Sequence, residues 1–343
     1  MDDATYMERA LDLAALGREW VSPNPMVGCV IVHDHKIIGE GLHQAYGQAH
    51  AEINALENVK DKTLIADATV YVTLEPCVHH GKTPPCTDAL IQQGVKRVVI
   101  CNEDPFPQVS GKGAARLRAA GITVETGLLA QQGEALNQRF FKVHRTGLPY
   151  IILKWAETAD GFIAGPGGVR AKISNSVTDL TVHRWRAEED AILVGKNTVL
   201  SDNPHLNVRH WTNDKQPVRV ILGSGLETTP GLHIFDNRQK TLIYNRNCKK
   251  EENQTEFIPV TNLPEVLQLL TARGINSLLV EGGKKIHEAF LSGNLFDEIR
   301  VIKSTKRLKA GITAPTLPSG ILLEKNIRIL DDQLFFYRNI PTF

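Results

Sequence analysis

The hydrophobic positions of the first half of the chain recur with the spacings of short helices and strands. From Ala4 to Glu19, apolar residues lie three or four apart behind an acidic start, which predicts an amphipathic helix. Val27–His33 and Lys36–Glu40 are β-rich runs that predict a hairpin. Beyond them, strands are predicted over 69–74, 95–101 and 122–125, and helices over 51–59, 87–93, 111–120 and 131–143. This alternation predicts an α/β layer structure in which helices cover a sheet.

The pattern restarts after the break Thr146-Gly147-Leu148-Pro149. We therefore expect two α/β domains, over residues 1–146 and 147–343, rather than one large sheet. The charged segment 249–254 is predicted to be a solvated loop. In the second domain, strands are predicted over 150–156, 191–194, 218–222, 242–244, 277–280 and 298–302, and helices over 177–187, 263–272 and 284–291.

Composition narrows the classes of function. The chain has 343 residues, of which 42% are hydrophobic and 22% charged, and this excludes a mostly disordered protein. Its 39 basic and 38 acidic residues give a net charge of +1, which argues against a nucleic-acid partner. No apolar run reaches the roughly 20 residues of a membrane span, and five scattered cysteines are too few for a disulfide framework. We expect a cytoplasmic enzyme that acts on a small molecule, with no membrane partner.

One group of residues carries a recognisable chemistry. His50-Ala51-Glu52 opens a predicted helix, and Cys77 and Cys86 flank a loop that follows a predicted strand. One imidazole and two thiolates leave a fourth position on zinc for water, which is typical of catalytic zinc. Pro84 and Pro85 place Cys86 near a helix N-terminus, where a thiol's pKa is lowered. Glu52 is not needed as a ligand, and it is placed to carry the proton between water and a leaving amine.

Two features of this motif leave alternatives open. His79 or His80 could complete a closed, purely structural zinc site, although Glu52 would then have no role. The cysteines are separated by eight residues instead of the two that are typical of nucleoside and nucleic-acid deaminases. The longer loop carries His79, Lys82 and Thr83, and Lys82 is either a contact to a phosphorylated substrate or a solvated cation.

The second half has weaker signals. Val280-Glu281-Gly282-Gly283 ends a predicted strand and begins a helix, where phosphate could approach free N–H groups, but taken alone the motif is better explained as a plain helix-entry turn. A strand ending at Gly195 precedes a polar segment with Thr198, Asp202 and Arg209. Arg186 and Arg209 could each pair a phosphate through two hydrogen bonds or be exposed surface residues.

Several motifs together resemble one family. Ser22-Pro23-Asn24-Pro25-Met26-Val27-Gly28, His50-Ala51-Glu52 and the segment from Glu75-Pro76-Cys77 to Cys86 closely resemble the deaminase half of the bifunctional riboflavin-biosynthesis deaminase/reductases. The segment 153–161 resembles the start of that family's reductase domain, so the resemblance covers nearly the whole chain. It implies a cytidine-deaminase-like α/β/α N-terminal domain and a dihydrofolate-reductase-like α/β C-terminal domain.

The resemblance also implies the reactions and their residues. The zinc domain would deaminate 2,5-diamino-6-(5-phosphoribosylamino)pyrimidin-4-one, and the second domain would use NADPH to reduce the ribosyl group to the ribityl chain. In the metal site, His50, Cys77 and Cys86 would bind Zn²⁺ and Glu52 would be catalytic. Asn24, His43 and His79 would contact the pyrimidine or line its site. In the reductase domain, Ala156, Lys172, Thr198, Asp202 and Gly283 would line the dinucleotide, and Lys154, Arg170, Arg186, Leu206, Arg209 and Glu281 would hold the substrate.

Some positions depart from the family pattern, and other functions remain to be weighed. Phe106 stands where the family usually has Asn, and Arg170 and Lys172 lie where it has a Ser-x-Trp-like segment. Arg170 and Lys172 therefore either bind phosphates or alter cofactor binding.

One alternative function is that of a tRNA adenosine deaminase with an accessory C-terminal domain. Another is a non-catalytic, zinc-bound scaffold that binds nucleotides. The resemblance also suggests a homo-oligomer paired through the reductase domains.

Overall fold

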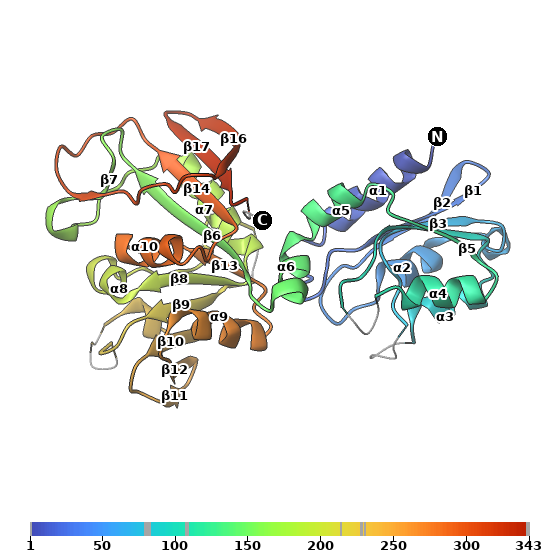
Figure 1. The fold of residues 1–343 in the computed structure, drawn as a ribbon, viewed down its shortest axis with the longest axis horizontal. Coiled ribbons are helices and arrows are strands. Elements are labelled where there is room, and N and C mark those ends of the chain that lie inside the picture. The colour runs from blue at the N-terminus through green and yellow to red at the C-terminus, as the bar shows by residue number, and fades with distance from the viewer. Residues whose placement is uncertain are drawn as a thin grey trace. The chain divides into compact units, whose positions relative to one another are not determined.

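The computed structural model describes residues 2–78, 84–106, 110–212, 215–226, 229 and 231–340. Contacts between Cα atoms divide the chain into two compact units, Met1–Gly147 and Leu148–Phe343 (Figure 1). The sequence prediction placed the boundary between residues 146 and 147. Within the described residues, no helix combines the length and the hydropathy that a membrane crossing requires.

The N-terminal unit is a five-stranded sheet with helices on both faces. Its strand order is β2-β1-β3-β4-β5, in which β1 is antiparallel to β2 and β3, and β3, β4 and β5 are parallel. The strands are β1 (Gly28–His33), β2 (Lys36–Leu42), β3 (Thr69–Leu74), β4 (Arg97–Asn102) and β5 (Thr123–Thr126). The helices are α1 (Asp3–Ala15), α2 (Ala51–Asn58), the 3₁₀ turn η1 (Lys62–Leu64), α3 (Cys86–Gln92), α4 (Lys112–Ala119), α5 (Ala130–Leu136) and α6 (Gln138–Thr146).

Alternating side chains of the strands form the two cores of this unit. Cys29 and Ile31 of β1 point toward α2, α3 and α4, whereas Val30 and Val32 point toward α1 and the start of α5. This period of two matches the predicted α/β/α layers, and the β1–β2 hairpin is confirmed.

The helix predicted over 131–143 is wrong as a single element, because α5 and α6 are separated at Asn137. The Asn137 side chain accepts a hydrogen bond from the Met26 N–H and donates one to the Met26 carbonyl, both at 2.8 Å. These long-range bonds hold Asn137 in a non-helical conformation, which no local pattern could reveal. The first helix also ends earlier than predicted, at Ala15, and turns follow it.

The C-terminal unit is built on a ten-stranded sheet with the order β11-β12-β10-β9-β8-β13-β6-β14-β17-β16. The strands from β12 to β14 in this order are parallel, and β11, β17 and β16 are antiparallel to their neighbours. A two-stranded sheet, β7 (Phe162–Ala164) with β15 (Ile312–Thr313), lies apart from it. The ten strands are β6 (Tyr150–Glu157), β8 (Ala191–Gly195), β9 (Val218–Leu222), β10 (Thr241–Asn245), β11 (Lys250–Glu252), β12 (Thr255–Pro259), β13 (Ser277–Val280), β14 (Glu298–Lys303), β16 (Leu322–Ile329) and β17 (Asp332–Arg338).

Helices again cover both faces of this sheet. The helices α9 (Leu263–Ala272) and α10 (Lys284–Ser292) pack on the face that includes Leu153 and Leu193, and α7 (Ser176–Glu188) and α8 (Lys196–Asp202) pack on the opposite face. Two 3₁₀ turns complete the unit, η2 (Pro166–Gly168) and η3 (His233–Phe235). The chain passes from β6 through α7 to β8, and β13 inserts between these two strands.

Three sequence-based expectations for this unit need correction. The charged segment 249–254 is not simply a loop, because Lys250–Glu252 forms β11, a fully exposed edge strand paired with β12. The polar segment after Gly195 is the helix α8, which the pattern missed because Val199 is its one buried residue. The final hairpin of β16 and β17 was also missed, since most of β16 is exposed and its residues therefore do not alternate between buried and exposed.

Candidate functional site

The three predicted zinc ligands come together in the N-terminal unit. His50 is the N-cap residue of α2, Cys86 is the first residue of α3, and Cys77 follows β3. Their ligand atoms all lie within 4.8 Å of one another, with 3.2 Å between His50 Nδ1 and Cys86 Sγ and 3.7 Å between His50 Nδ1 and Cys77 Sγ. Nitrogen and sulfur ligands of a tetrahedral zinc ion lie about 3.5 to 3.8 Å apart. The donor set therefore fits zinc, with the His50–Cys77 distance of 3.7 Å inside this range and the His50–Cys86 distance of 3.2 Å below it.

The start of α3 stabilises a thiolate at Cys77. The Cys86 N–H donates a hydrogen bond to Cys77 Sγ at 3.3 Å, and the Thr87 hydroxyl donates to the Cys77 carbonyl at 3.0 Å. A hydrogen bond from the Cys86 thiol lowers the pKa of Cys77, and the same shared proton raises the pKa of Cys86. A cation bound here would replace that proton.

Glu52 lies in the first turn of α2, beside the three ligands, and is 3% exposed. Burial raises the pKa of Glu52, His50 partly opposes this effect, and Cys77 adds to it. A carboxyl group with a raised pKa holds a transferred proton more readily than an exposed one. It is therefore suited to move a proton between a water molecule and a leaving amine.

Close packing of α2 against β2 fixes the position of His50 and Glu52. A Cβ atom on Gly41 of β2 would lie 2.3 Å from the Ala55 nitrogen and 2.4 Å from the Ala51 oxygen. Both are backbone atoms of α2, so glycine is required for the helix to approach the strand this closely.

Two of the predicted substrate contacts adjoin the metal ligands. The Asn24 amide nitrogen lies 3.0 Å from His43 Nε2, and the His43 ring meets the His50 ring edge-on at 5.6 Å. His43 Nδ1 lies 3.0 Å from the Ala49 carbonyl, so Nδ1 carries the proton and Nε2 accepts from Asn24. Burial lowers the pKa of His43, which keeps this imidazole neutral. His79, and with it Lys82 and Thr83, lies outside the described residues.

A residue to which the sequence analysis gave no role supports the metal loop. Glu75, 4% exposed and two residues before Cys77, accepts hydrogen bonds from the N–H groups of Asp104, Gly111 and Ala114 at 3.2, 2.9 and 3.0 Å. It therefore ties the end of β3 to the start of α4. Phe106, the departure from the family pattern, packs edge-on against His144 at 5.4 Å.

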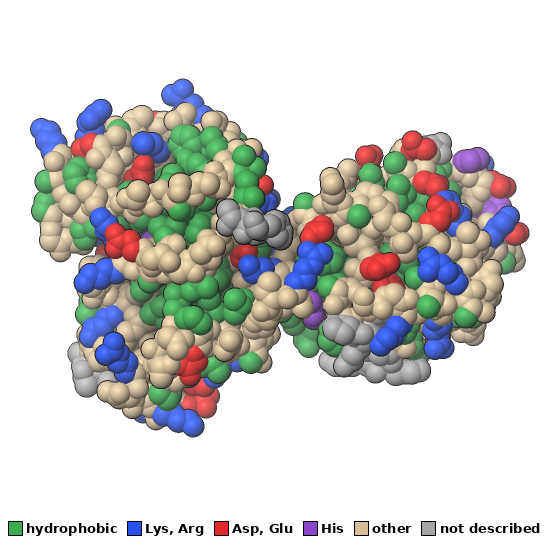
Figure 2. All heavy atoms as spheres, in the orientation of Figure 1, with side chains coloured by type: hydrophobic (Ala, Val, Ile, Leu, Met, Phe, Trp, Pro, Cys, Tyr) green, Lys and Arg blue, Asp and Glu red, His purple; other side chains and the backbone are tan. Residues whose placement is uncertain are grey.

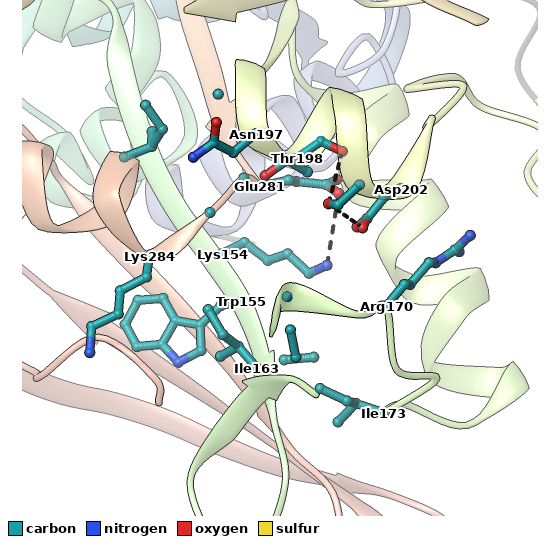
Figure 3. Close-up of a pocket in the computed structure, with 18 of the residues that line it drawn as sticks. Lys154, Trp155, Ile163, Arg170, Ile173, Asn197, Thr198, Asp202, Glu281 and Lys284 are labelled. Atoms are coloured by element: carbon teal, nitrogen blue, oxygen red, sulfur yellow. Dashed lines mark hydrogen bonds and ion pairs between the residues drawn. The ribbon is translucent and has the colours of Figure 1, made fainter. Parts of the chain in front are cut away.

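The C-terminal unit contains a cavity of about 1080 Å³ at the carboxyl ends of β6, β8 and β13. In a parallel sheet, ligands bind in this position, where the strand order reverses. Figure 2 shows lysine and arginine side chains gathered over the part of this unit that carries α8. Figure 3 shows the cavity, with Lys154 and Trp155 from β6 opposite Thr198 and Asp202 from α8.

All five residues predicted for the cofactor line this cavity. Gly283 precedes α10 with a φ of +77°, a conformation that favours glycine, and a Cβ atom there would lie 3.1 Å from Thr198 Oγ1. The starts of α8 and α10 are therefore adjacent. Lys172 forms an ion pair with Asp179, whose carboxylate also accepts from the Ser174 hydroxyl at 2.8 Å. The lining includes Ala156, Lys172, Thr198, Asp202 and Gly283.

A buried ion cluster forms one wall of the cavity. Arg186 donates to both carboxylate oxygens of Glu281 at 2.7 Å, and Lys154 Nζ lies 3.9 Å from the same carboxylate. Burial opposes ionisation of Glu281, but the charges of Arg186 and Lys154 outweigh it and lower its pKa to about 2. Burial lowers the pKa of Lys154. Arg186 is therefore not an exposed surface residue. Its guanidinium, which was expected to bind a phosphate, binds the Glu281 carboxylate instead.

The other predicted substrate residues lie in different surroundings. Arg170 and Arg209 line the cavity, whereas the Leu206 side chain is buried in the hydrophobic core with Ile192 and Val194. Partial desolvation, together with the positive charges of Arg186 and Arg170, lowers the pKa of the exposed Arg209. Cationic side chains therefore converge near Arg209, as expected of a site for an anionic ligand.

Comparisons with known proteins identify the family of each domain. The model of the RibD C-terminal domain matches residues 149–329, and that of the cytidine and deoxycytidylate deaminase zinc-binding region matches residues 1–102. The riboflavin biosynthesis protein RibD of Bacillus amyloliquefaciens is 42% identical over 327 residues, covering 92% of this chain and 87% of that protein. RibD of Escherichia coli is 41% identical over 330 residues, covering 90% and 89%.

The chain belongs to the RibD family. A crystal structure of the diaminohydroxyphosphoribosylaminopyrimidine deaminase/5-amino-6-(5-phosphoribosylamino)uracil reductase of Thermotoga maritima aligns with a TM-score of 0.90 at 35% identity, covering 98% of each chain. Acinetobacter baumannii RibD aligns with a TM-score of 0.89 at 35% identity, also covering 98% of each.

Membership of the RibD family confirms the predicted fold and the two activities. The protein is a bifunctional enzyme of riboflavin biosynthesis, with a zinc-dependent deaminase domain and an NADPH-dependent reductase domain. The similarity continues through the C-terminal domain, which an accessory domain on a tRNA deaminase would not explain.

Proposed function

We propose that the N-terminal domain hydrolyses the 2-amino group of 2,5-diamino-6-(5-phosphoribosylamino)pyrimidin-4-one, and that the C-terminal domain then reduces the ribosyl side chain of the product to ribityl. The convergence of His50, Cys77 and Cys86 beside the buried Glu52 carries the proposal. The relatives named for deaminase and reductase activity support the choice of substrate.

In the deamination step, His50, Cys77 and Cys86 would hold the metal. Bound Zn²⁺ supplies the Lewis acidity that activates a water molecule. The Glu52 carboxylate removes a proton from that water and later returns it to the departing amine, so ammonia leaves. Asn24 and His43 form the adjoining wall of the site, where they would contact the pyrimidine.

In the reduction step, NADPH supplies the hydride, which C1′ of the opened ribosyl group accepts. The protein binds and orients the two reactants. Ala156, Thr198, Asp202 and Gly283 line the part of the cavity that we assign to the dinucleotide. Arg209 and Arg170, which line the cavity, would bind the phosphate of the substrate, and Arg186 holds Glu281 beside Lys154.

A stepwise assay tests the proposal. Purified protein with bound zinc is given the diaminopyrimidine phosphate without NADPH, and ammonia release and the aminouracil product are measured. NADPH is then added, and its oxidation is followed with the ribityl product. We expect one ammonia per substrate in the first stage and one NADPH oxidised per product in the second. Absence of ammonia release from zinc-loaded protein would reject the assignment of the substrate.

Two further expectations remain predictions. The family resemblance suggests a homo-oligomer paired through the reductase domains, which sedimentation of the purified protein can test. The cytoplasmic location can be tested by fractionating cells of the source organism. Neither expectation changes the conclusion that the substrate is a small molecule.

A further inference from the structure

The segment from His205 to Arg209 connects α8 to β9 and has no regular secondary structure, yet side chains from elsewhere hold its backbone at every residue. We call residues 205–209 the anion loop. Arg219 Nε donates to the His205 carbonyl at 2.9 Å, and Gln239 Nε2 donates to the Leu206 carbonyl at 2.8 Å. Arg186 Nη1 donates to the Asn207 carbonyl at 3.2 Å.

The last two residues of the loop are held in the same way. Gln216 accepts from the Val208 N–H at 2.8 Å and donates to the Val208 carbonyl at 3.0 Å, as a neighbouring β-strand would. The Arg209 N–H donates to Nδ1 of the buried His183 at 3.3 Å. Five consecutive residues are therefore fixed by five different side chains.

The supporting side chains are themselves immobilised. Arg219 is fully buried and pairs with Asp236, with 2.8 Å between Nη1 and Oδ1. Gln239 also donates to the Pro217 carbonyl at 2.8 Å, and Arg186 is held by Glu281. Such a frame can keep Leu206 at a φ of +49°, a conformation that residues with a side chain rarely adopt.

These supporting side chains hold the anion loop so that its Arg209 guanidinium lies at the cavity. Arg209 lines the cavity wall, and its Nη1 donates to the Asn207 side chain within the loop at 3.1 Å. The charges of Arg186 and Arg170 act on Arg209, and like charges held together are relieved by an anion. The backbone bonds thus hold Arg209 in a place that its own electrostatics would disfavour.

We propose that the anion loop preorganises Arg209 for the phosphate of the ribosyl substrate, and that Gln216 is a positioning residue that sets the affinity for this phosphate. The proposal rests on the proposed function, since that assigns Arg209 to the substrate. Among the described residues, Gln216 does not line the cavity, and it reaches the anion loop through its two bonds to Val208. A loop that is already ordered loses less entropy when it binds a ligand.

The test replaces Gln216 by Met, which keeps the side-chain length but removes the donor and the acceptor. We expect the reductase KM for the phosphorylated aminouracil to rise about tenfold, equivalent to 1.4 kcal/mol. The kcat, the KM for NADPH and the deaminase rate should be unchanged. The KM for the dephosphorylated aminouracil should also be unchanged, and amide exchange should accelerate in residues 205–209.

Two other variants make the test specific. Asn262→Ala removes the N-cap of α9, a comparable side-chain bond to a backbone N–H outside the anion loop, and should leave every KM unchanged. Gln239→Met removes the bonds to Leu206 and Pro217 and should raise the same KM as Gln216→Met does. It serves as the second variant if Gln216→Met does not fold.

Faster amide exchange in the loop with an unchanged KM for the phosphorylated substrate would overturn the proposal. An equal rise in KM for the dephosphorylated substrate would overturn it as well, because the effect would then not concern the phosphate. If the wild-type protein fails to reduce the aminouracil at all, the proposed function is wrong. Binding of ribose 5-phosphate, measured by calorimetry, then tests the loop alone: tenfold weaker binding by Gln216→Met supports it, and equal binding overturns it.

Discussion

Replacing Glu52 by Gln tests the chemistry of the zinc domain most directly. Glutamine has the same shape as the carboxylic acid, so the side chain still fits beside Cys77, but it cannot carry a proton. Positioned proton transfer accounts for roughly 10²- to 10⁴-fold in rate, which is about 3 to 5 kcal/mol of the activation barrier. We expect the deaminase kcat to fall by that factor.

The same substitution should leave the fold and the metal intact. Glu52 is 3% exposed, and burial of its charge raises its pKa, so the neutral Gln removes a desolvation penalty. The melting temperature should therefore be equal to or higher than that of the wild type. Ammonia release, zinc content and NADPH oxidation on the aminouracil product are measured on one preparation. A variant that keeps one zinc per chain and more than a tenth of the wild-type deaminase rate would refute the role of Glu52.

Three other predictions follow from distances and charges already described. Arg209→Ala should raise the reductase KM for the phosphorylated aminouracil by 10²-fold or more, because a lost charged hydrogen bond costs on the order of 3 kcal/mol. Ammonia release should be unchanged, and equal loss of both activities would point to one shared site. Gly41→Ala should weaken zinc binding in a chelator competition, because its methyl group would lie 2.3 Å from the Ala55 nitrogen and force α2 away from β2; unchanged zinc affinity would contradict this account. Burial, followed by neighbouring positive charges, lowers the pKa of His183 from 6.5 to about 4. As the pH falls from 6.5 toward 4 the unfolded state takes up this proton first, so the unfolding free energy should drop by up to about 3 kcal/mol. Urea titrations of the wild type and of His183→Asn should show a smaller drop in the variant.

The zinc site could be predicted from the sequence because its residues lie close to element ends that the pattern already marks. His50 and Glu52 occupy one helix start, and Cys86 occupies the next. Their convergence needs only that two helices begin at the same edge of the sheet. Asn137 shows the opposite case, since its bonds to Met26 join residues 111 positions apart, and no periodicity signals them.

The reductase site depends on strand order, which the hydrophobic pattern does not specify. Lys154, Arg186 and Glu281 meet because β13 inserts between β6 and β8. The hydrophobic periodicity predicts the strands and the helix that carry these residues, but it does not predict which strands lie next to one another in the sheet. The family resemblance implies a phosphate contact for the Arg186 guanidinium, whereas the structure pairs it with Glu281. Gln216 and Gln239 give no local signal at all, because their role is defined by backbone atoms of a distant loop.

Each site contains charged groups whose position is unfavourable for the stability of the free protein. The two sites hold these groups in different ways. In the zinc domain the Glu52 carboxyl group is buried, and its neighbours are the groups that would hold a cation. In the reductase domain several cations converge, and a frame of neutral and paired side chains holds the loop that carries Arg209. Substitution of Glu52 should therefore stabilise the free protein while it reduces activity, whereas substitution of Gln216 or Arg219 should reduce both. The sign of the change in unfolding free energy therefore distinguishes a residue that acts on the ligand from residues that position other side chains.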